Sequence, residues 1–86
     1  MDNFVILTRI ATPDDMLGKR VLVYSADDTL VHVMGWDYSV NVRENHLRAM
    51  RQWMHRDGYT LHHYIASAPL GMANPGMWVH VWEPGD

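Results

Sequence analysis

The six histidines are the side chains best suited to metal binding or proton transfer, because imidazole binds transition metals and titrates near neutral pH. His62 and His63 are neighbours in an expected strand, so they point to opposite faces. His46 and His55, nine residues apart in an expected helix, lie half a rotation apart. A metal site would need His46, one of the adjacent pair and a third residue. With no H-x-x-x-H motif, we expect no metal and no cofactor.

Two pairs of adjacent aspartates could hold a cation or act as catalytic acids. The pairs are Asp14-Asp15 and Asp27-Asp28. Such pairs are also routine in turns and at helix N-termini, where backbone N–H groups favour carboxylates. The chain contains no cysteine and no G-x-S-x-G, P-loop or G-x-G-x-x-G motif, so no motif frames a nucleophile. We therefore expect no catalytic residue and no enzymatic activity.

The content of aromatic and methionine side chains is the least ordinary feature, with four Trp and seven Met in 86 residues. In the alternating run 77–82 one strand face is aromatic and the other aliphatic. The first face holds Trp78, His80 and Trp82, and the second holds Met77, Val79 and Val81. One face should meet a helix. The other packs on loops, forms a homodimer surface, or binds a partner or ligand, because Trp and Met are enriched at interface centres.

Two further stretches are candidates for contact with a partner. The loop 68–76 carries no charge, so it either packs down onto the core or is presented to a partner, with Leu70 and Met72 as its contact residues. The expected helix over 41–57 carries four arginines against two acids, the only basic stretch of the chain. Arg48, Arg51 and Arg56 would steer an acidic partner toward the domain.

The elements that must position these side chains follow from hydrophobic periodicity. Strands are predicted at 4–10, 20–24, 29–34, 59–66 and 77–82, with a short helical turn from Thr12 to Gly18. The first strand is a continuous apolar run, which is typical of a central strand or one covered on both faces. Residues 25–28 form a polar turn, so the second and third strands make a hairpin.

The helix has the strongest signals. Asn41 followed by Glu44 resembles a capping box, Glu44 precedes Arg48 by four residues, and Gly58 stops the helix. One arc of the helix is apolar and should pack on the sheet. It holds Val42, His46, Leu47, Ala49, Met50, Trp53 and Met54. The fold class is therefore α+β, a mostly antiparallel sheet of about five strands with one helix on one face, in the order β-β-β-α-β-β.

Length and composition limit the function classes. The 86 residues allow one domain, 1–86. No apolar run is long enough to cross a membrane, no signal peptide begins the chain and cysteine is absent, so we expect a cytoplasmic protein. A net charge of −3 makes nucleic acid an unlikely partner.

The favoured hypothesis is a small non-enzymatic module or inhibitor that covers the surface of a partner protein. The partner would contact Trp78, His80, Trp82, Leu70, Met72, Arg48, Arg51 and Arg56. One alternative is a ligand-binding or minor catalytic domain with a pocket between helix and sheet, and another is a homo-oligomeric structural protein. The pocket would be lined by His46, Trp53, His62, His63 and Tyr64.

From the helix through Asp57-Gly58-Tyr59 to the last two strands, the chain resembles small uncharacterised bacterial and phage α+β families, a resemblance that implies no function. In size and character it is similar to small phage-encoded proteins that act on host or defence proteins, including anti-CRISPR-type inhibitors. That similarity implies an anti-defence or host-modulating protein, which would bind its target through the same surfaces.

Overall fold

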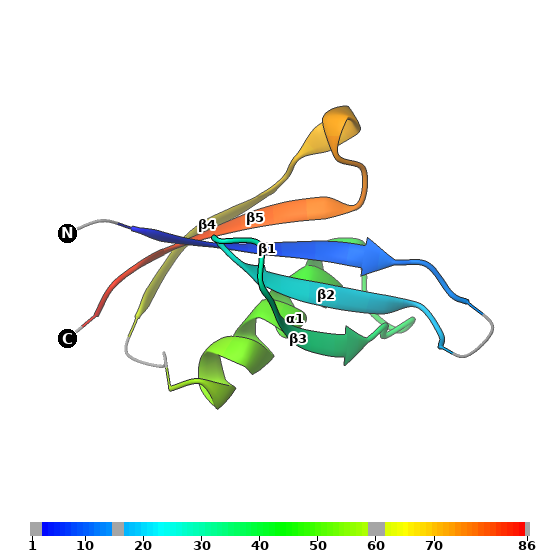
Figure 1. The fold of residues 1–86 in the computed structure, drawn as a ribbon, viewed down its shortest axis with the longest axis horizontal. Helices are drawn as coiled ribbons and strands as arrows, with labels where there is room; N and C mark the ends of the chain where they lie inside the picture. Colours follow the sequence, from blue (N-terminus) through cyan, green and yellow to red (C-terminus); the bar gives the residue numbers. More distant parts are fainter. Residues whose placement is uncertain (1–2, 15–16, 59–61, 86) are drawn as a thin grey trace.

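A computed structural model describes residues 3–14, 17–58 and 62–85. Within these residues the element order is the predicted β-β-β-α-β-β, and Figure 1 shows the strands and the helix. The elements are β1 (Phe4–Ala11), β2 (Arg20–Ser25), β3 (Leu30–Gly35), α1 (Val42–Arg56), β4 (His63–Pro69), η1 (Gly71–Ala73), a single 3₁₀ turn, and β5 (Met77–Glu83). The α+β prediction is confirmed.

The strands form one antiparallel sheet in the order β3-β2-β1-β5-β4. The β2–β3 hairpin is the one predicted from its polar turn, where Asp28 adopts a left-handed conformation with φ of 68°. A second hairpin joins β4 and β5. The central strand β1 connects the two hairpins by pairing with β2 on one side and β5 on the other.

Helix α1 begins and ends as its sequence predicts. The Asn41 side chain accepts a hydrogen bond from the Glu44 N–H at 2.8 Å, which caps the N-terminus. The Arg48 side chain reaches Glu44 at 3.4 Å, the expected pair one turn apart. Gly58 follows the helix with φ of 82°, a conformation that glycine adopts without steric cost.

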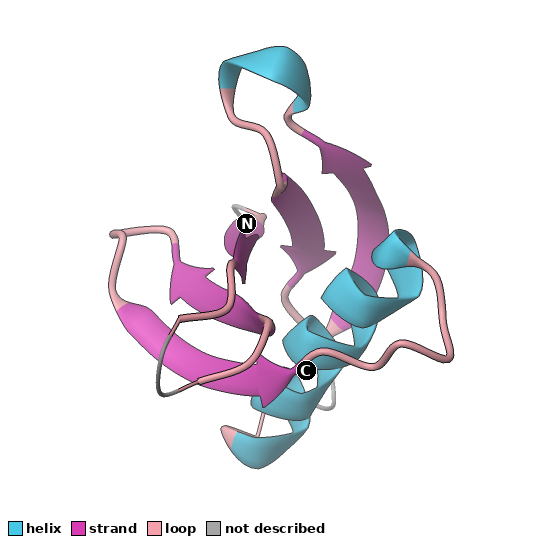
Figure 2. Ribbon diagram, turned by 90° about the vertical axis from the view of Figure 1, so that its right-hand side faces the viewer, coloured by secondary structure: helices cyan, strands magenta, loops and turns pink. Residues whose placement is uncertain are grey.

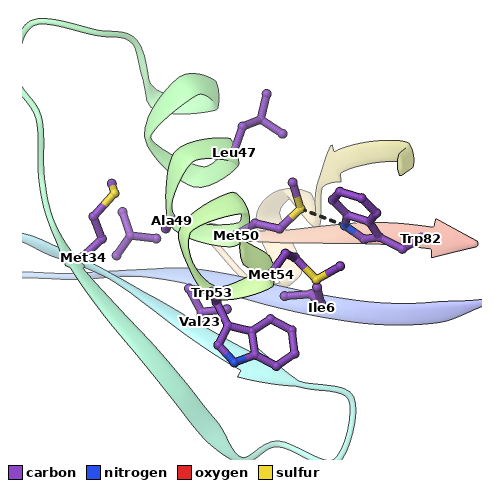
Figure 3. Close-up of a cluster of buried hydrophobic side chains, with 10 residues drawn as sticks. Ile6, Val23, Met34, Leu47, Ala49, Met50, Trp53, Met54 and Trp82 are labelled. Atoms are coloured by element: carbon purple, nitrogen blue, oxygen red, sulfur yellow. Dashed lines mark hydrogen bonds between the residues drawn. The ribbon is translucent and has the colours of Figure 1, made fainter. Parts of the chain in front are cut away.

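Alternation along β1, β2 and β5 places one set of side chains in a core between one sheet face and the helix. Side chains at alternate strand positions are buried, and Figure 3 shows most of them meeting the helix stripe. The buried hydrophobic residues are Ile6, Val21, Val23, Met34, Leu47, Ala49, Met50, Trp53, Met54 and Trp82. The predicted apolar stripe of the helix is confirmed except for Val42, which is exposed. Asn45, which was not part of the predicted stripe, is buried.

Asn45 is buried because it holds the connection between β3 and α1. Its side-chain oxygen accepts from the Asp37 N–H at 2.8 Å, and its amide donates to the Asp37 carbonyl at 2.9 Å and the Asn41 carbonyl at 3.1 Å. Three hydrogen bonds compensate the loss of water around this amide, which is why a polar side chain can lie inside. Periodicity alone does not report such bonds.

The other sheet face has no described element over it, and Figure 2 shows the helix on one side of the curved sheet only. The strand positions between the buried ones point to this face and are partly exposed. Strand β1 lies at the centre of the strand order, as predicted. The helix covers one of its two faces, and no described element covers the other. A continuous apolar run does not distinguish a strand buried on two faces from one with an apolar open face.

Two segments differ from their predictions. Strand β4 runs from His63 to Pro69, where 59–66 was expected, because pairing with β5 from Glu83 to Trp78 sets its length. The expected start at 59–61 lies outside the described residues. Residues 12–14 and 17–19 form a loop without helix, in which the Asp14 carboxylate accepts from the Leu17 N–H at 2.7 Å. Residues 15–16 of the expected helical turn are also outside the described residues.

Candidate functional site

A hydrogen-bonded cluster of polar side chains lies in the core, at the contact of helix and sheet. Thr8 projects from β1 toward the helix, and its hydroxyl oxygen lies 2.6 Å from Nδ1 of His46 on α1. The same oxygen lies 2.7 Å from Nε2 of His80 on β5. All three side chains are fully buried. Three elements that are distant in sequence thus meet at one hydroxyl group.

The cluster continues to the surface through the edge strand β4. The Ser67 hydroxyl lies 2.5 Å from Nδ1 of His80, and the Tyr64 hydroxyl donates to the Ser67 oxygen at 2.6 Å. Tyr64 is 37% exposed. The resulting chain of five side chains leads from solvent at Tyr64 to His46 under the helix.

The donors along this chain can be assigned with every side chain neutral. Ser67 donates to Nδ1 of His80, whose Nε2–H donates to Thr8, whose hydroxyl donates to Nδ1 of His46. His46 then carries its hydrogen on Nε2, an atom with no hydrogen-bond partner among the described residues. The His46 ring stacks on Trp78 with centroids 5.3 Å apart.

Burial keeps both imidazoles neutral. Desolvation lowers the pKa of His46 from 6.5 to about 4. Desolvation lowers the pKa of His80 to about 4 as well, with repulsion from His46 as a second cause. At neutral pH the cluster is therefore an uncharged network, and its imidazoles are weak bases.

The role that this cluster supports is to fix the position of the helix on the sheet. Ser67 beside a neutral imidazole has the components of a nucleophile and base, but burial lowers the pKa of His80 and makes it a weaker base than a free imidazole. The hydroxyls of Thr8 and Ser67 and both ring nitrogens of His80 are hydrogen-bonded within the network, while Nε2 of His46 has no partner among the described residues. No pocket opens among the residues that the structure describes. A wrong helix position would leave these buried polar atoms unpaired, so the network fixes how α1 lies on the sheet.

The five residues of the expected ligand pocket do not line a common space. His46 and Trp53 are buried in the core, and Tyr64 closes the outer end of the hydrogen-bonded chain. His62 contacts the Phe4 ring at 5.0 Å between centroids, and its Nδ1 accepts from the Gly85 N–H at 3.1 Å; His63 is exposed at the start of β4. Within residues 3–14, 17–58 and 62–85, no group of three acidic, His or Cys side chains is placed to hold a metal.

The aromatic face of β5, expected to bind a partner, is the face that meets the helix. His80 is buried, and Trp82 is buried with its indole N–H donating to the Met50 sulfur at 3.2 Å (Figure 3). Trp78 is half-buried against His46. A partner docking on the folded domain therefore does not reach His80 or Trp82.

Leu70 and Met72, by contrast, lie at the tip of the β4–β5 hairpin. Figure 1 shows this tip reaching away from the rest of the domain. Met72 is 98% exposed and Leu70 is 37% exposed. This is the part of the expected partner-binding set that the fold presents to solvent.

Two of the helix arginines, Arg48 and Arg51, are partly neutralised by acidic neighbours. Arg48 lies 2.9 Å from Asp37 and 3.4 Å from Glu44, and Arg51 lies 3.9 Å from Glu44. Arg56 donates to Nδ1 of His32 at 3.4 Å. Their exposed pairs contribute little stability, and the paired acids reduce the positive field they present.

Thr8 and Ser67 were not among the site residues predicted from the sequence, although the sequence contains one indication of the Thr8 contact. Thr8 interrupts an apolar strand at a position in phase with Ile6, and His80 interrupts the aromatic face of β5 in the same way. Two polar residues at core-facing positions of different strands point to a buried hydrogen bond. Nothing in the sequence indicated that Ser67 would pair with His80, because the register of β4 was not predicted.

Comparison with family models, curated proteins and solved structures found nothing that matches this chain. Among the described residues no helix combines the length and hydropathy that a membrane span requires.

Proposed function

We propose that this domain is a non-enzymatic protein-binding module that covers part of a partner protein with the tip of its β4–β5 hairpin. The observation that carries the proposal is the position of Met72, which is 98% exposed at the end of the hairpin. A flexible, polarisable thioether adapts to an apolar recess, and methionine is over-used at surfaces that bind other proteins. The partner expected from this chemistry offers an apolar pocket.

The tip is held by backbone hydrogen bonds, which lowers the entropy cost of binding. The Leu70 N–H donates to the Met77 carbonyl at 2.9 Å, and the Met77 N–H donates to the Asn74 carbonyl at 3.1 Å. Gly71 and Gly76 have φ of 73° and 79°, conformations that non-glycine residues adopt only with strain. The Ile10 N–H donates to the Gly76 carbonyl at 3.0 Å and ties the loop to β1. Met72 is therefore presented on a defined turn.

The surroundings of the tip suit an apolar contact. Residues 68–76 carry no charge, so burying them does not remove an ionised group from water. Full burial of the Met72 side chain would contribute about 1.5–3 kcal/mol. Leu70, which is 37% exposed, adds a second apolar group.

The form of action we propose is inhibition by covering a partner's surface, as small phage-encoded inhibitors do. The absence of cysteine from the sequence supports a cytoplasmic setting. The proposal uses neither the buried His80 and Trp82 nor any catalytic group.

The test is site-specific photo-cross-linking in cells of the organism that makes the protein. A photo-reactive amino acid replaces Met72 in one variant. In the control it replaces Tyr38, which is 78% exposed in the connection between β3 and α1. We expect a discrete cross-linked product from position 72 only. Excess wild-type protein should compete it away in a lysate, and the Met72→Asp variant should not. Equal products from positions 72 and 38, or none from position 72, would refute the proposal.

A further inference from the structure

The sheet face opposite the helix is apolar where water is expected. Its central positions come from three neighbouring strands, and each is aliphatic and partly exposed. They are Val5, Leu7, Leu22, Val79 and Val81. Val5 lies directly opposite Val81, and Leu7 lies directly opposite Val79, so these four side chains are contiguous. On the neighbouring β2, Tyr24 lies opposite Leu7 and Leu22 lies opposite Arg9. An antiparallel sheet with one solvated face normally carries polar residues there. A continuous aliphatic face of this kind marks an interaction surface.

Charges of opposite sign lie at the two ends of this face. Arg9 is exposed on β1 beside Met77, and Glu83 is exposed at the far end of β5. Met77 and Glu83 lie six positions apart in an extended strand, about 20 Å. Arg9 donates to the Tyr24 hydroxyl at 3.2 Å, and neither Arg9 nor Glu83 forms an ion pair within the described part of the chain. Val5, Leu7, Val79 and Val81 lie between the two charges, and Leu22 lies beside Arg9.

We propose that a second copy of this chain covers this face, so that two sheets pack face to face around a two-fold axis. For two identical faces in contact the axis must lie in the plane between them. An axis running along the strands would place Arg9 against the partner's Arg9. An axis across the strands places Arg9 against the partner's Glu83 at both ends, and the aliphatic groups meet in the middle. The charges therefore select the second arrangement.

The size of the face agrees with such a dimer. Five strands about 4.8 Å apart and about 24 Å long present a footprint of roughly 600 Å², to which side-chain relief adds. A stable interface buries about 800 Å² on each partner. Two sheets in contact form a layer of interdigitated side chains about 10 Å thick, with strands aligned within about 30°.

The proposed dimer leaves the hairpin tip and the helix outside the interface. Figure 1 shows the tip extending beyond the body of the sheet, and Figure 2 shows the helix on the opposite side. The inference thus goes beyond the proposed function. Cross-linking from position 72 and the mass of the free protein can fail or succeed independently.

The mass in solution tests the proposal directly. In sedimentation equilibrium from about 1 to 500 μM the wild-type chain should show twice the monomer mass, with Kd in the micromolar range or below. Val79→Lys places a charge at the centre of the interface and should raise Kd at least about a hundredfold. Val42→Lys is the matched control, because Val42 is an exposed valine on the helix, and it should leave Kd unchanged.

Charge reversal tests the orientation and does not depend on a core substitution. Arg9→Glu and Glu83→Arg each turn two attractive contacts into repulsive ones and should each raise Kd about tenfold or more. The double variant restores the pairing with exchanged signs and should return Kd to within about threefold of the wild type. Circular dichroism of each variant verifies the fold.

Three results would overturn the proposal. A wild-type chain that remains monomeric to 500 μM excludes the dimer. A dimer that tolerates Val79→Lys uses another surface. A dimer weakened by each single reversal but not restored by the double variant does not have the two-fold arrangement derived from the charges.

Discussion

Acidification should destabilise this domain at pH values above the range in which carboxylates titrate. His46 and His80 have pKa values of about 4 in the folded chain, against 6.5 for an unperturbed imidazole. The unfolded chain therefore binds protons more readily than the folded one. Stability is full above about pH 7.5, falls as pH drops through 6.5, and stops falling below about pH 4.

The size of the effect follows from the two pKa values. At pH 5 each histidine favours the unfolded state by about 2 kcal/mol, so the pair removes about 4 kcal/mol relative to pH 7.5. A domain of this length has a total stability of roughly 4–13 kcal/mol, so the loss is a large share. Hydrogen bonds, from Ser25 to Asp27 and from Ser39 to Asp37, lower the pKa of each carboxyl below 3.8. Their contribution is present above that value and is lost only at lower pH, outside this window.

Urea unfolding followed by tryptophan fluorescence at pH 7.5, 6 and 5 measures the loss. His46→Asn keeps a polar atom near the Thr8 hydroxyl and removes one titrating group. Its loss between pH 7.5 and 5 should therefore fall from about 4 to about 2 kcal/mol. His63→Asn, at an exposed position of β4, is the control and should keep the wild-type loss.

A free energy of unfolding that is constant from pH 7.5 to pH 5 would show that the two imidazoles are not buried and neutral in the folded protein. A wild-type loss that His46→Asn does not change, or that His63→Asn halves, would assign the pH dependence to other groups.

Three further substitutions test the core and the helix cap. Thr8→Val removes the hydroxyl that lies 2.6 and 2.7 Å from the two imidazoles and should lower the free energy of unfolding by about 2–4 kcal/mol. Thr8→Ser keeps the hydroxyl and should lower the free energy of unfolding by about 1 kcal/mol. Equal urea midpoints for the two variants would contradict a role for the hydroxyl. Met50→Ala empties a fully buried site under Trp82 and should cost about 2–5 kcal/mol by the same measurement, with a loss below about 1 kcal/mol indicating that the core is looser than described. Asn41→Ala removes the side chain that accepts from Glu44 N–H at 2.8 Å and should cost about 1 kcal/mol, seen as a lower thermal midpoint that Asn41→Asp does not show.

Capping, helix-stop and periodicity patterns predicted this fold well, because most of its elements are determined by residues close together in the sequence. The capping of Asn41, the ion pair of Arg48 and the stop at Gly58 each depend on residues within four positions, and all are present. Alternation identified the two faces of β5. It could not say which face meets the helix, because both are bulky.

The site depends on pairings that local rules do not contain. Thr8 meets His80 across 72 positions and His46 across 38. Ser67 joins them only because β4 pairs with β5 in a register that includes a bulge near Tyr64. Contacts of this kind follow from the assembled sheet, so they become visible only when the strand order is known.

The place of β1 in the sheet has a consequence for synthesis on the ribosome. Its partner β5 is the last described strand, and the hydrogen-bond partner of Thr8, His80, is synthesised 72 positions later. Until that stretch has emerged, the nascent chain holds an apolar strand with one unpaired edge, open to pairing with other chains. Closing so distant a contact is slow compared with forming a helix or hairpin. A chaperone that shields β1 during translation should therefore raise the yield of folded protein more than one that acts on the finished chain.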